Sequence, residues 1–188
     1  MRVGSYQSLS ATGHTTAWES AISQATSKVD LRWENEGWTA EGTLGTDNAQ
    51  FVLRLSAGWK IQQFLLFRDM QEPDLWLGTD GSGRWGEVNG AHRTDLDGCT
   101  DLDLAGTPFT NCIPIRRLPL HIGDSATISV AVIDTETLSV IRATHQYTKV
   151  AQRTWRYLST SSGAEVQVTV DEFVFVLDEP NNFRRLII

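Results

Sequence analysis

The chain has 188 residues, 40% of them hydrophobic and 21% charged, and its 16 Lys and Arg against 23 Asp and Glu give a formal net charge of −7. This length and composition fit one domain, residues 1–188, with a core of its own, and they exclude an acidic disordered chain. No apolar run approaches the roughly 20 residues that a membrane-spanning helix needs. The acidic balance and the scattered basic residues argue against nucleic-acid binding.

The first stretch of the chain fits two local structures. Thr16-Ala17-Trp18-Glu19 matches a helix capping box, and apolar residues from Trp18 to Val29 recur at helical spacing. The Thr and Ser content of the same stretch favours a strand and a loop instead. Both alternatives stay open. The first 25 residues have no apolar core after a basic start, so we expect no secretory signal and a cytoplasmic protein.

Most of the remaining sequence alternates between apolar and polar residues with a period of two, which is typical of strands buried on one face. The predicted strands, in chain order, are Thr39 to Leu44, Gln50 to Leu55, Lys60 to Phe67, Asp74 to Leu77, Trp85 to Val88, Ile113 to Ile122, Ala126 to Ile133, Leu138 to Tyr147, Thr154 to Leu158, and Ala164 to Leu177. Their spacing suits a meander that curls into a roll or barrel. We therefore expect an all-β fold, a partly closed antiparallel sheet with at most one or two short helices.

No pattern predicts a metal ion or a cofactor. Gly81 to Gly86 matches G-x-G-x-x-G, but the flanking strands favour a glycine-rich hairpin turn over a dinucleotide site. An acidic cluster begins at Asp95, yet Thr100 and Gly106 occupy the positions at which a calcium loop needs Gly and Glu. The four histidines lack the spacing of a zinc site.

The two cysteines are Cys99 and Cys112. They could lie opposite each other across a hairpin centred near Ala105 and Gly106. A reducing compartment would keep them as thiols, and we expect thiols rather than a structural disulfide.

A short strand with alternating character precedes that turn. Leu102 and Leu104 face one side, and Asp101 and Asp103 face the other. At ~3.3 Å per residue the two aspartates are about 6.5 to 7 Å apart, near the low edge of the carboxyl separation in inverting glycosidases. A glycoside-directed hydrolase that uses Asp101 and Asp103 is therefore one alternative function. Aspartates in this setting more often cap turns or pair with arginines.

Turn-forming residues follow at Thr107-Pro108 and Thr110-Asn111, around Phe109 as a single anchor. Pro114 cannot donate to a strand ladder, so we expect a new strand to begin there or to run along an edge.

One face of this predicted strand is apolar except for Arg116. An unpaired buried guanidinium costs several kcal/mol, so the pattern predicts an ion pair between Arg116 and Asp101 or Asp103 that locks the turn. Arg117 is expected to point outward or into a cavity mouth.

The segment Gly98 to Leu118, together with Leu31 to Gly42 and Gln146-Tyr147-Thr148, resembles the bacterial family of putative glycolipid-binding proteins. Thr107 to Leu118 is the most specific part, and weaker agreement runs from Trp18 to Pro180. The resemblance implies a spiral β-roll and a role in binding glycolipid-like amphiphiles. We therefore expect a non-catalytic protein that holds a glycolipid or similar amphiphile in the concavity of the roll.

The sequence departs from the family pattern at three places. Cys112-Ile113 stands where Thr-Leu is usual. Glu179 precedes Pro180 where an aromatic residue is typical, with Asn181 in place of Gly after it. A stretch around Ser23 to Asp30 is extra, and its role is not apparent from the sequence.

The chain contains seven tryptophans, whose rings could stack on sugars or line an acyl groove. The candidate ligand-binding residues around one cavity are Arg54, Trp59, Asp101, Asp103, Arg116, Gln146 and Tyr147. The residues expected to form the structural motif are Thr107, Pro108, Phe109, Thr110, Asn111, Pro114 and Arg117. A third alternative is a structural or interaction module whose exposed sheet edge pairs with another chain.

Overall fold

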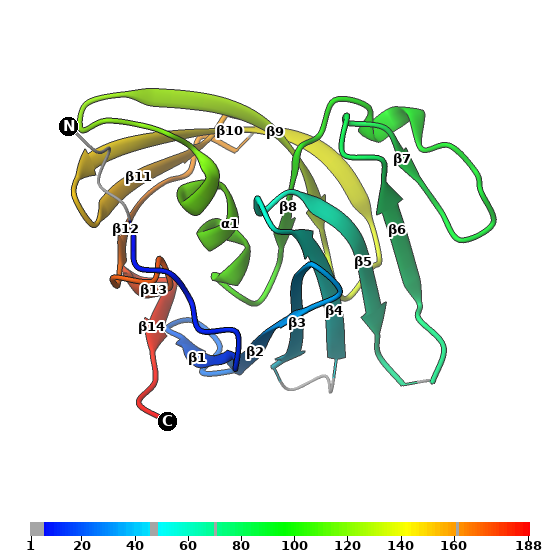
Figure 1. Ribbon diagram of the computed structural model, residues 1–188, viewed down its shortest axis with the longest axis horizontal. Helices are drawn as coiled ribbons and strands as arrows, with labels where there is room; N and C mark the ends of the chain where they lie inside the picture. The colour runs from blue at the N-terminus through cyan, green and yellow to red at the C-terminus, as the bar shows by residue number, and fades with distance from the viewer. Residues whose placement is uncertain (1–5, 46–48, 70, 161) are drawn as a thin grey trace.

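Figure 1 shows a computed structural model of the protein, which describes residues 6–45, 49–69, 71–160 and 162–188. The strands are β1 (His14–Ser20), β2 (Thr26–Glu34), β3 (Gly37–Leu44), β4 (Ala49–Ser56), β5 (Ile61–Phe67), β6 (Leu75–Thr79), β7 (Trp85–Gly86), β8 (Asp101–Leu104), β9 (Ser125–Ile133), β10 (Val140–Ala151), β11 (Thr154–Ser159), β12 (Glu165–Val170), β13 (Val176–Glu179) and β14 (Phe183–Arg185). The helices are a 3-10 helix, η1 (Thr94–Leu96), and α1 (Phe109–Arg117). The mostly β fold that the sequence predicts is confirmed.

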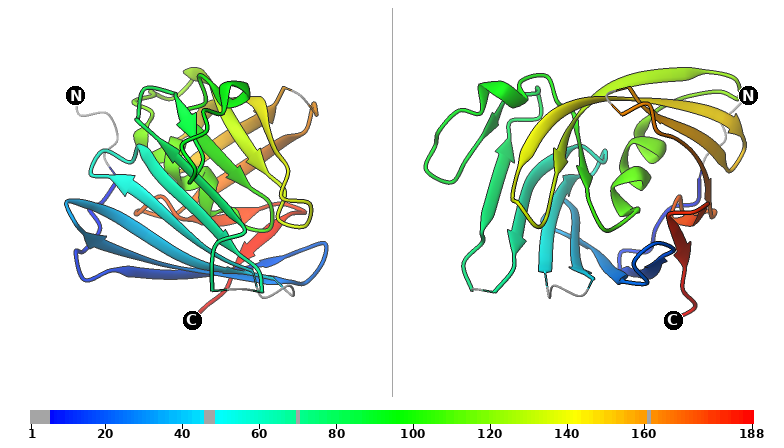
Figure 2. Two further views of the ribbon diagram at one scale, coloured as in Figure 1. Left: turned by 90° about the vertical axis from the view of Figure 1, so that its right-hand side faces the viewer. Right: turned by 180° about the vertical axis from the view of Figure 1, so that it is seen from behind.

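The strands form one 14-stranded sheet in the order β7-β6-β5-β4-β3-β2-β1-β14-β13-β12-β11-β10-β9-β8. Neighbouring strands of the described sheet are antiparallel except β8 and β9, which are parallel and connected through α1. The sheet curls around α1, as the rear view in Figure 2 shows. Its edge strands β7 and β8 do not pair with each other, so the sheet is an open roll.

Alternation along the strands separates the core from the outside of the roll. Ala40, Leu53, Phe64 and Leu77 lie side by side across β3 to β6 and are fully buried. Because side chains alternate in direction along a strand, their neighbours in sequence face the opposite side. Burial of each large apolar side chain in such rows contributes about 1.5 to 3 kcal/mol.

Helix α1 replaces the strand predicted from Ile113 to Ile122, and that prediction is wrong. Residues 109–115 are all buried, so the segment has no polar face to reveal helical periodicity. The Thr107 hydroxyl accepts a hydrogen bond from the Phe109 amide at 3.3 Å at the helix start. Pro114 lies inside the helix instead of beginning a strand, and the helix ends at Arg117, because Leu118 is extended before Pro119.

The helix considered for the first stretch is also absent, because Thr16 to Val29 belongs to strands β1 and β2 and the turn between them. Trp18 is fully buried, and its indole donates to the Val176 carbonyl oxygen at 2.8 Å. Ile22, which would lie on the apolar face of that helix, is 80% exposed in the turn. The strand-and-loop alternative is therefore the one that the structure adopts.

Candidate functional site

The ion pair predicted inside the roll is present, but Arg117 forms it. The Arg117 guanidinium donates to the Asp101 carboxylate, which also accepts the Thr100 hydroxyl at 2.7 Å. The Asp101 side chain is 1% exposed and that of Arg117 is 21% exposed. The prediction assumed a strand, whereas successive side chains of a helix point about 100° apart. The pair links the end of α1 to β8.

Arg116 instead links α1 to two other segments by hydrogen bonds, so its predicted pairing with an aspartate is wrong. Its guanidinium donates to the Phe173 carbonyl oxygen at 2.8 Å and to the Gln7 carbonyl oxygen at 3.0 Å. It also lies 4.9 Å from the centre of the Trp59 ring. Burial lowers the pKa of Arg116. The contacts of Arg116 and Trp59 hold the helix in place.

Tyr147 belongs to a buried polar network that joins β10, α1 and β13. Its hydroxyl donates to Asn111 Oδ1 at 2.7 Å, and Asn111 Nδ2 donates to Glu179 Oε2 at 3.3 Å. Asn182 Nδ2 donates to the other Glu179 oxygen at 3.0 Å. Burial raises the pKa of both Tyr147 and Glu179. A buried network with satisfied partners specifies one packing of these elements.

Asp103 lies on the inner side of the roll, beside a second polar group that consists of Tyr157 and His145. The Tyr157 hydroxyl is 3.1 Å from His145 Nε2 and 3.5 Å from Asp103 Oδ2. Burial lowers the pKa of His145 to about 4, so its ring is neutral at pH 7 and shares a hydrogen bond with the Tyr157 hydroxyl. Asp103 keeps 32% of its side-chain area exposed, yet the surrounding protein raises its pKa by desolvation. The two aspartates of the hydrolase hypothesis therefore have unlike surroundings, since Asp101 binds Arg117.

The structure places the predicted ligand-binding residues on both sides of the sheet. Gln146 lies between the buried His145 and Tyr147 on β10, and its side chain faces the opposite side of the sheet. Arg54 faces the outside of the roll, away from α1. The residues predicted to form the structural motif lie in α1 and the turn before it, and all of them are buried except Arg117, which is half-buried.

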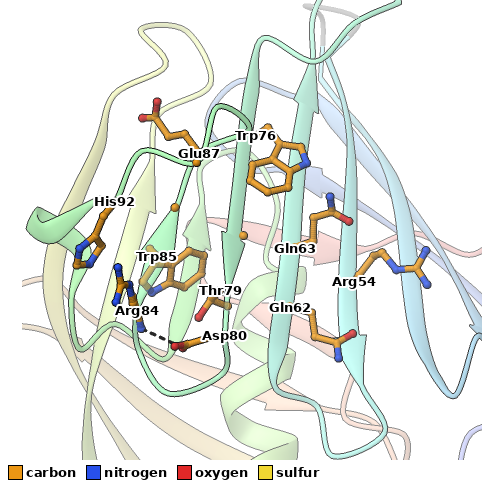
Figure 3. Close-up of a pocket in the computed structure, with 13 residues that line it drawn as sticks. Arg54, Gln62, Gln63, Trp76, Thr79, Asp80, Arg84, Trp85, Glu87 and His92 are labelled. Atoms are coloured by element: carbon orange, nitrogen blue, oxygen red, sulfur yellow. Dashed lines mark hydrogen bonds between the residues drawn. The ribbon is translucent and has the colours of Figure 1, made fainter.

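A pocket of about 510 Å³ lies on the outside of the roll, over strands β4 to β7 (Figure 3). We call it the outer pocket, and its lining residues are Arg54, Gln62, Gln63, Trp76, Gly78, Thr79, Asp80, Arg84, Trp85, Gly86, Glu87, Gly90 and His92. Its volume is in the range of small-molecule sites. Of the predicted ligand-binding residues, only Arg54 lines it.

A β-bulge brings two amide side chains to the outer pocket. Arg54 pairs with Gln63, but the next residue, Leu55, pairs with Ile61, so Gln62 is an extra residue in β5. Bulges redirect side chains and recur beside functional sites. Figure 3 shows Gln62 and Gln63 projecting beside Arg54. Each amide offers both hydrogen-bond donors and acceptors.

Trp76 provides an aromatic surface in the outer pocket. Its indole lies along β6 over Gly78, where an added Cβ atom would come within 2.9 Å of Trp76 Cη2. Gly78 pairs with Gly86 on β7, so the backbone is bare beneath and beside the ring. Trp85 is buried, and its indole donates to the Cys99 carbonyl oxygen at 2.9 Å. Trp85 therefore forms one side of the outer pocket, and its hydrogen bond holds the ring in place.

The charged groups of the outer pocket balance in sign. Arg54 and Arg84 are cations, and Asp80 and Glu87 are anions. The Ser82 hydroxyl, which donates to Asp80 at 2.7 Å, holds the pKa of that carboxyl below its ordinary value. A balanced set of donors and acceptors around an aromatic ring suits an uncharged, polyhydroxylated ligand better than a phosphate.

The sequence alone did not identify the outer pocket, although some of its features leave a recognisable pattern in the sequence. The prediction of a hairpin turn at Gly81 to Gly86 is confirmed, because β6 and β7 pair on either side of residues 80–84. The spacing of Trp76 and Gly78 places a large ring and a bare backbone on the same face of one strand. The consecutive amides Gln62 and Gln63 break the period-two alternation, which is the mark of a bulge.

Within the described ranges, no group of three or more His, Cys, Asp or Glu residues could hold a metal ion. Both cysteines are buried free thiols, and α1 separates Cys112 from the hairpin geometry that the sequence suggested. None of the helices in the described part of the chain has the length and apolar character needed to cross a membrane.

Comparison with known proteins places this arrangement in a family. A crystal structure of a DUF1089 family protein from Pseudomonas aeruginosa matches with a TM-score of 0.74 and 29% sequence identity, covering 85% of this chain and 92% of that chain. No curated protein matches the chain. A family model described as "Putative glycolipid-binding" matches residues 15–185. The chain therefore belongs to the putative glycolipid-binding family.

Proposed function

We propose that the protein is a non-catalytic binding protein for a glycolipid or similar amphiphile, and that the sugar head group binds in the outer pocket. The family description supports a glycolipid ligand. The exposed face of the Trp76 indole, held flat over Gly78, is the observation that carries the proposal. An apolar sugar face stacks on such a ring while hydroxyls bond to the surrounding amides and charges.

The proposed ligand site lies on the outside of the roll, whereas the sequence predicted a site in its concavity. The concavity expected from the sequence holds α1, whose residues 109–115 are buried against the strands. Phe109 lies 6.4 Å from Phe51 on β4 and 6.4 Å from Phe175 beside β13, measured between ring centres. The helix thus occupies the space between the two sides of the roll.

The test is calorimetric titration with a panel of methyl glycosides, comprising glucoside, galactoside, mannoside and rhamnoside. Wild-type protein is expected to bind at least one of them, and Trp76→Ala is expected to weaken that binding at least tenfold. Trp33→Ala is the matched control, because Trp33 is 39% exposed and does not line the outer pocket. Failure to bind any member of the panel, or undiminished binding by Trp76→Ala, would refute the proposal.

A further inference from the structure

An apolar row borders the outer pocket on the outside of the sheet. Val52 on β4 pairs with Leu65 on β5, and Leu65 pairs with Trp76 on β6. Directly paired residues face the same side of a sheet, so the three side chains form one continuous row across three strands. We call Trp76, Leu65 and Val52 the outer row.

The outer row does not contribute to the core. Its members are half-buried and lie outside the hydrophobic core cluster, which takes Leu53 and Phe64 from the same strands. The three side chains therefore pack against one another on the outer face and not against the interior of the roll. Contiguous apolar surface of this kind marks a site where something apolar binds.

The row begins in one pocket and ends in another. Trp76 lines the outer pocket, whereas Val52 lines a second groove of about 900 Å³ over β2 to β5. Beyond Val52 the next residue in the row is Glu41, which forms an ion pair with Arg32 at 2.6 Å. The apolar surface therefore starts at the proposed sugar site and stops at a charged pair.

We propose that the alkyl chain of a glycolipid bound in the outer pocket lies flat along the outer row, from Trp76 over Leu65 to Val52. This inference rests on the proposed function, because the sugar in the outer pocket fixes where the chain begins. The ligand class is an amphiphile with an uncharged sugar head and one alkyl chain outside the roll. Two strand spacings make the row about 10 Å long, which an extended chain of about eight carbons spans.

The length of the row gives a quantitative expectation. Affinity rises with each added methylene by at most about fourfold, the value for complete burial, and by less on a surface that covers one side of the chain. The increase stops near eight carbons, because further methylenes meet the charges of Glu41 and Arg32.

The experiment titrates methyl, butyl, hexyl, octyl and decyl glycosides of the sugar that binds best, below their critical micelle concentrations. Wild-type protein is expected to show a rising affinity that levels off near octyl. The double variant Val52→Thr with Leu65→Thr is expected to bind the methyl glycoside as the wild type does and to lose most of the chain-length dependence. Leu177→Thr, at a 39% exposed apolar position on β13, is the matched control.

The outcomes separate the two proposals. If the wild type binds the methyl glycoside but shows no chain-length dependence, the alkyl chain does not bind along the outer row, whereas the proposed sugar site is supported. A chain-length dependence in the double variant equal to that of the wild type also contradicts the proposal, because the alkyl chain then binds elsewhere on the protein. If the double variant does not fold, a nitroxide-labelled octyl glycoside added to wild-type protein decides the matter. It should broaden the methyl resonances of Leu65 and Val52, and unbroadened methyls count against the proposal.

Discussion

Replacement of Arg117 by Met is expected to destabilise the protein strongly. The change leaves the Asp101 carboxylate buried, at 1% side-chain exposure, without its cationic partner. Removal of one partner of a buried ion pair costs about 3 to 5 kcal/mol. For a chain of this length that loss lowers the melting temperature by about 6 to 20 °C. Met preserves the length of the apolar stem, so lost packing contributes little.

The assay is urea denaturation of four proteins, namely wild type, Arg117→Met, Asp101→Asn and the double variant. The double variant is expected to recover much of the loss, because no uncompensated charge remains, and the cycle should give a coupling energy above 1 kcal/mol. Arg116→Met is the matched control, because it removes two hydrogen bonds to carbonyl groups but leaves no buried charge without its partner. A loss below 1 kcal/mol for Arg117→Met, or a larger loss for Arg116→Met, would refute the assignment of the ion pair.

Three further predictions concern buried groups. The folded pKa of His145, about 4, is below the unfolded value of about 6.5, so protonation favours the unfolded chain as the pH falls between them, and stability declines in that window by up to roughly 3 kcal/mol. Urea midpoints of His145→Gln should fall less from pH 6.5 to pH 4.5 than those of the wild type, and parallel curves would contradict this. Tyr147→Phe leaves Asn111 Oδ1 without its donor and should cost about 1 to 3 kcal/mol in urea, whereas an unchanged midpoint would show that the hydrogen bond is dispensable. Burial raises the pKa of the Cys99 thiol to about 11 and that of Cys112 to about 12, so mass spectrometry should detect no iodoacetamide adduct of native protein at pH 8 and two after denaturation. Rapid native alkylation would contradict their burial.

The strands were predictable because half-buried strands leave a period of two in the sequence. Gln50 to Leu55 and Lys60 to Phe67, for example, correspond to β4 and β5 within a residue or two at each end. Alternation reports which face of a strand is buried, but it cannot report what covers that face. The position of α1 inside the roll was therefore not available from the pattern of the strands around it.

Helix α1 was mistaken for a strand for a related reason. A helix that is buried on every side has no polar stripe, and the buried Thr110, Asn111 and Pro114 are residues typical of turns and strand edges. Its boundaries carried weak signals, with Pro108 at the start and the basic residues Arg116 and Arg117 in the last turn. In a strand Arg116 would face Asp101, whereas in the helix Arg117 does, because the two geometries turn successive side chains by different angles.

The outer pocket depended on features that appear only after the strands are aligned. The extra residue Gln62 becomes a bulge only when β5 is set against β4. Gly78 and Gly86 form a bare surface only because the hairpin places them opposite each other. Single-strand patterns contain neither fact, which is why only Arg54 was common to the predicted residues and the pocket.

The pairing of β1 with β14 has a consequence for how the chain reaches its native state. Trp18 pairs with Arg185, so two segments more than 160 residues apart must meet in the middle of the sheet. During synthesis, β1 to β7 and β9 to β13 can each assemble from neighbouring hairpins, but they remain separate half-sheets until residues 183–185 emerge. Such long-range closure slows folding, because the entropy of ordering a long loop is lost before its contacts form. Throughout that delay the outward edge of β1 remains unpaired, so the nascent protein is most prone to misassociation before residues 183–185 join the sheet.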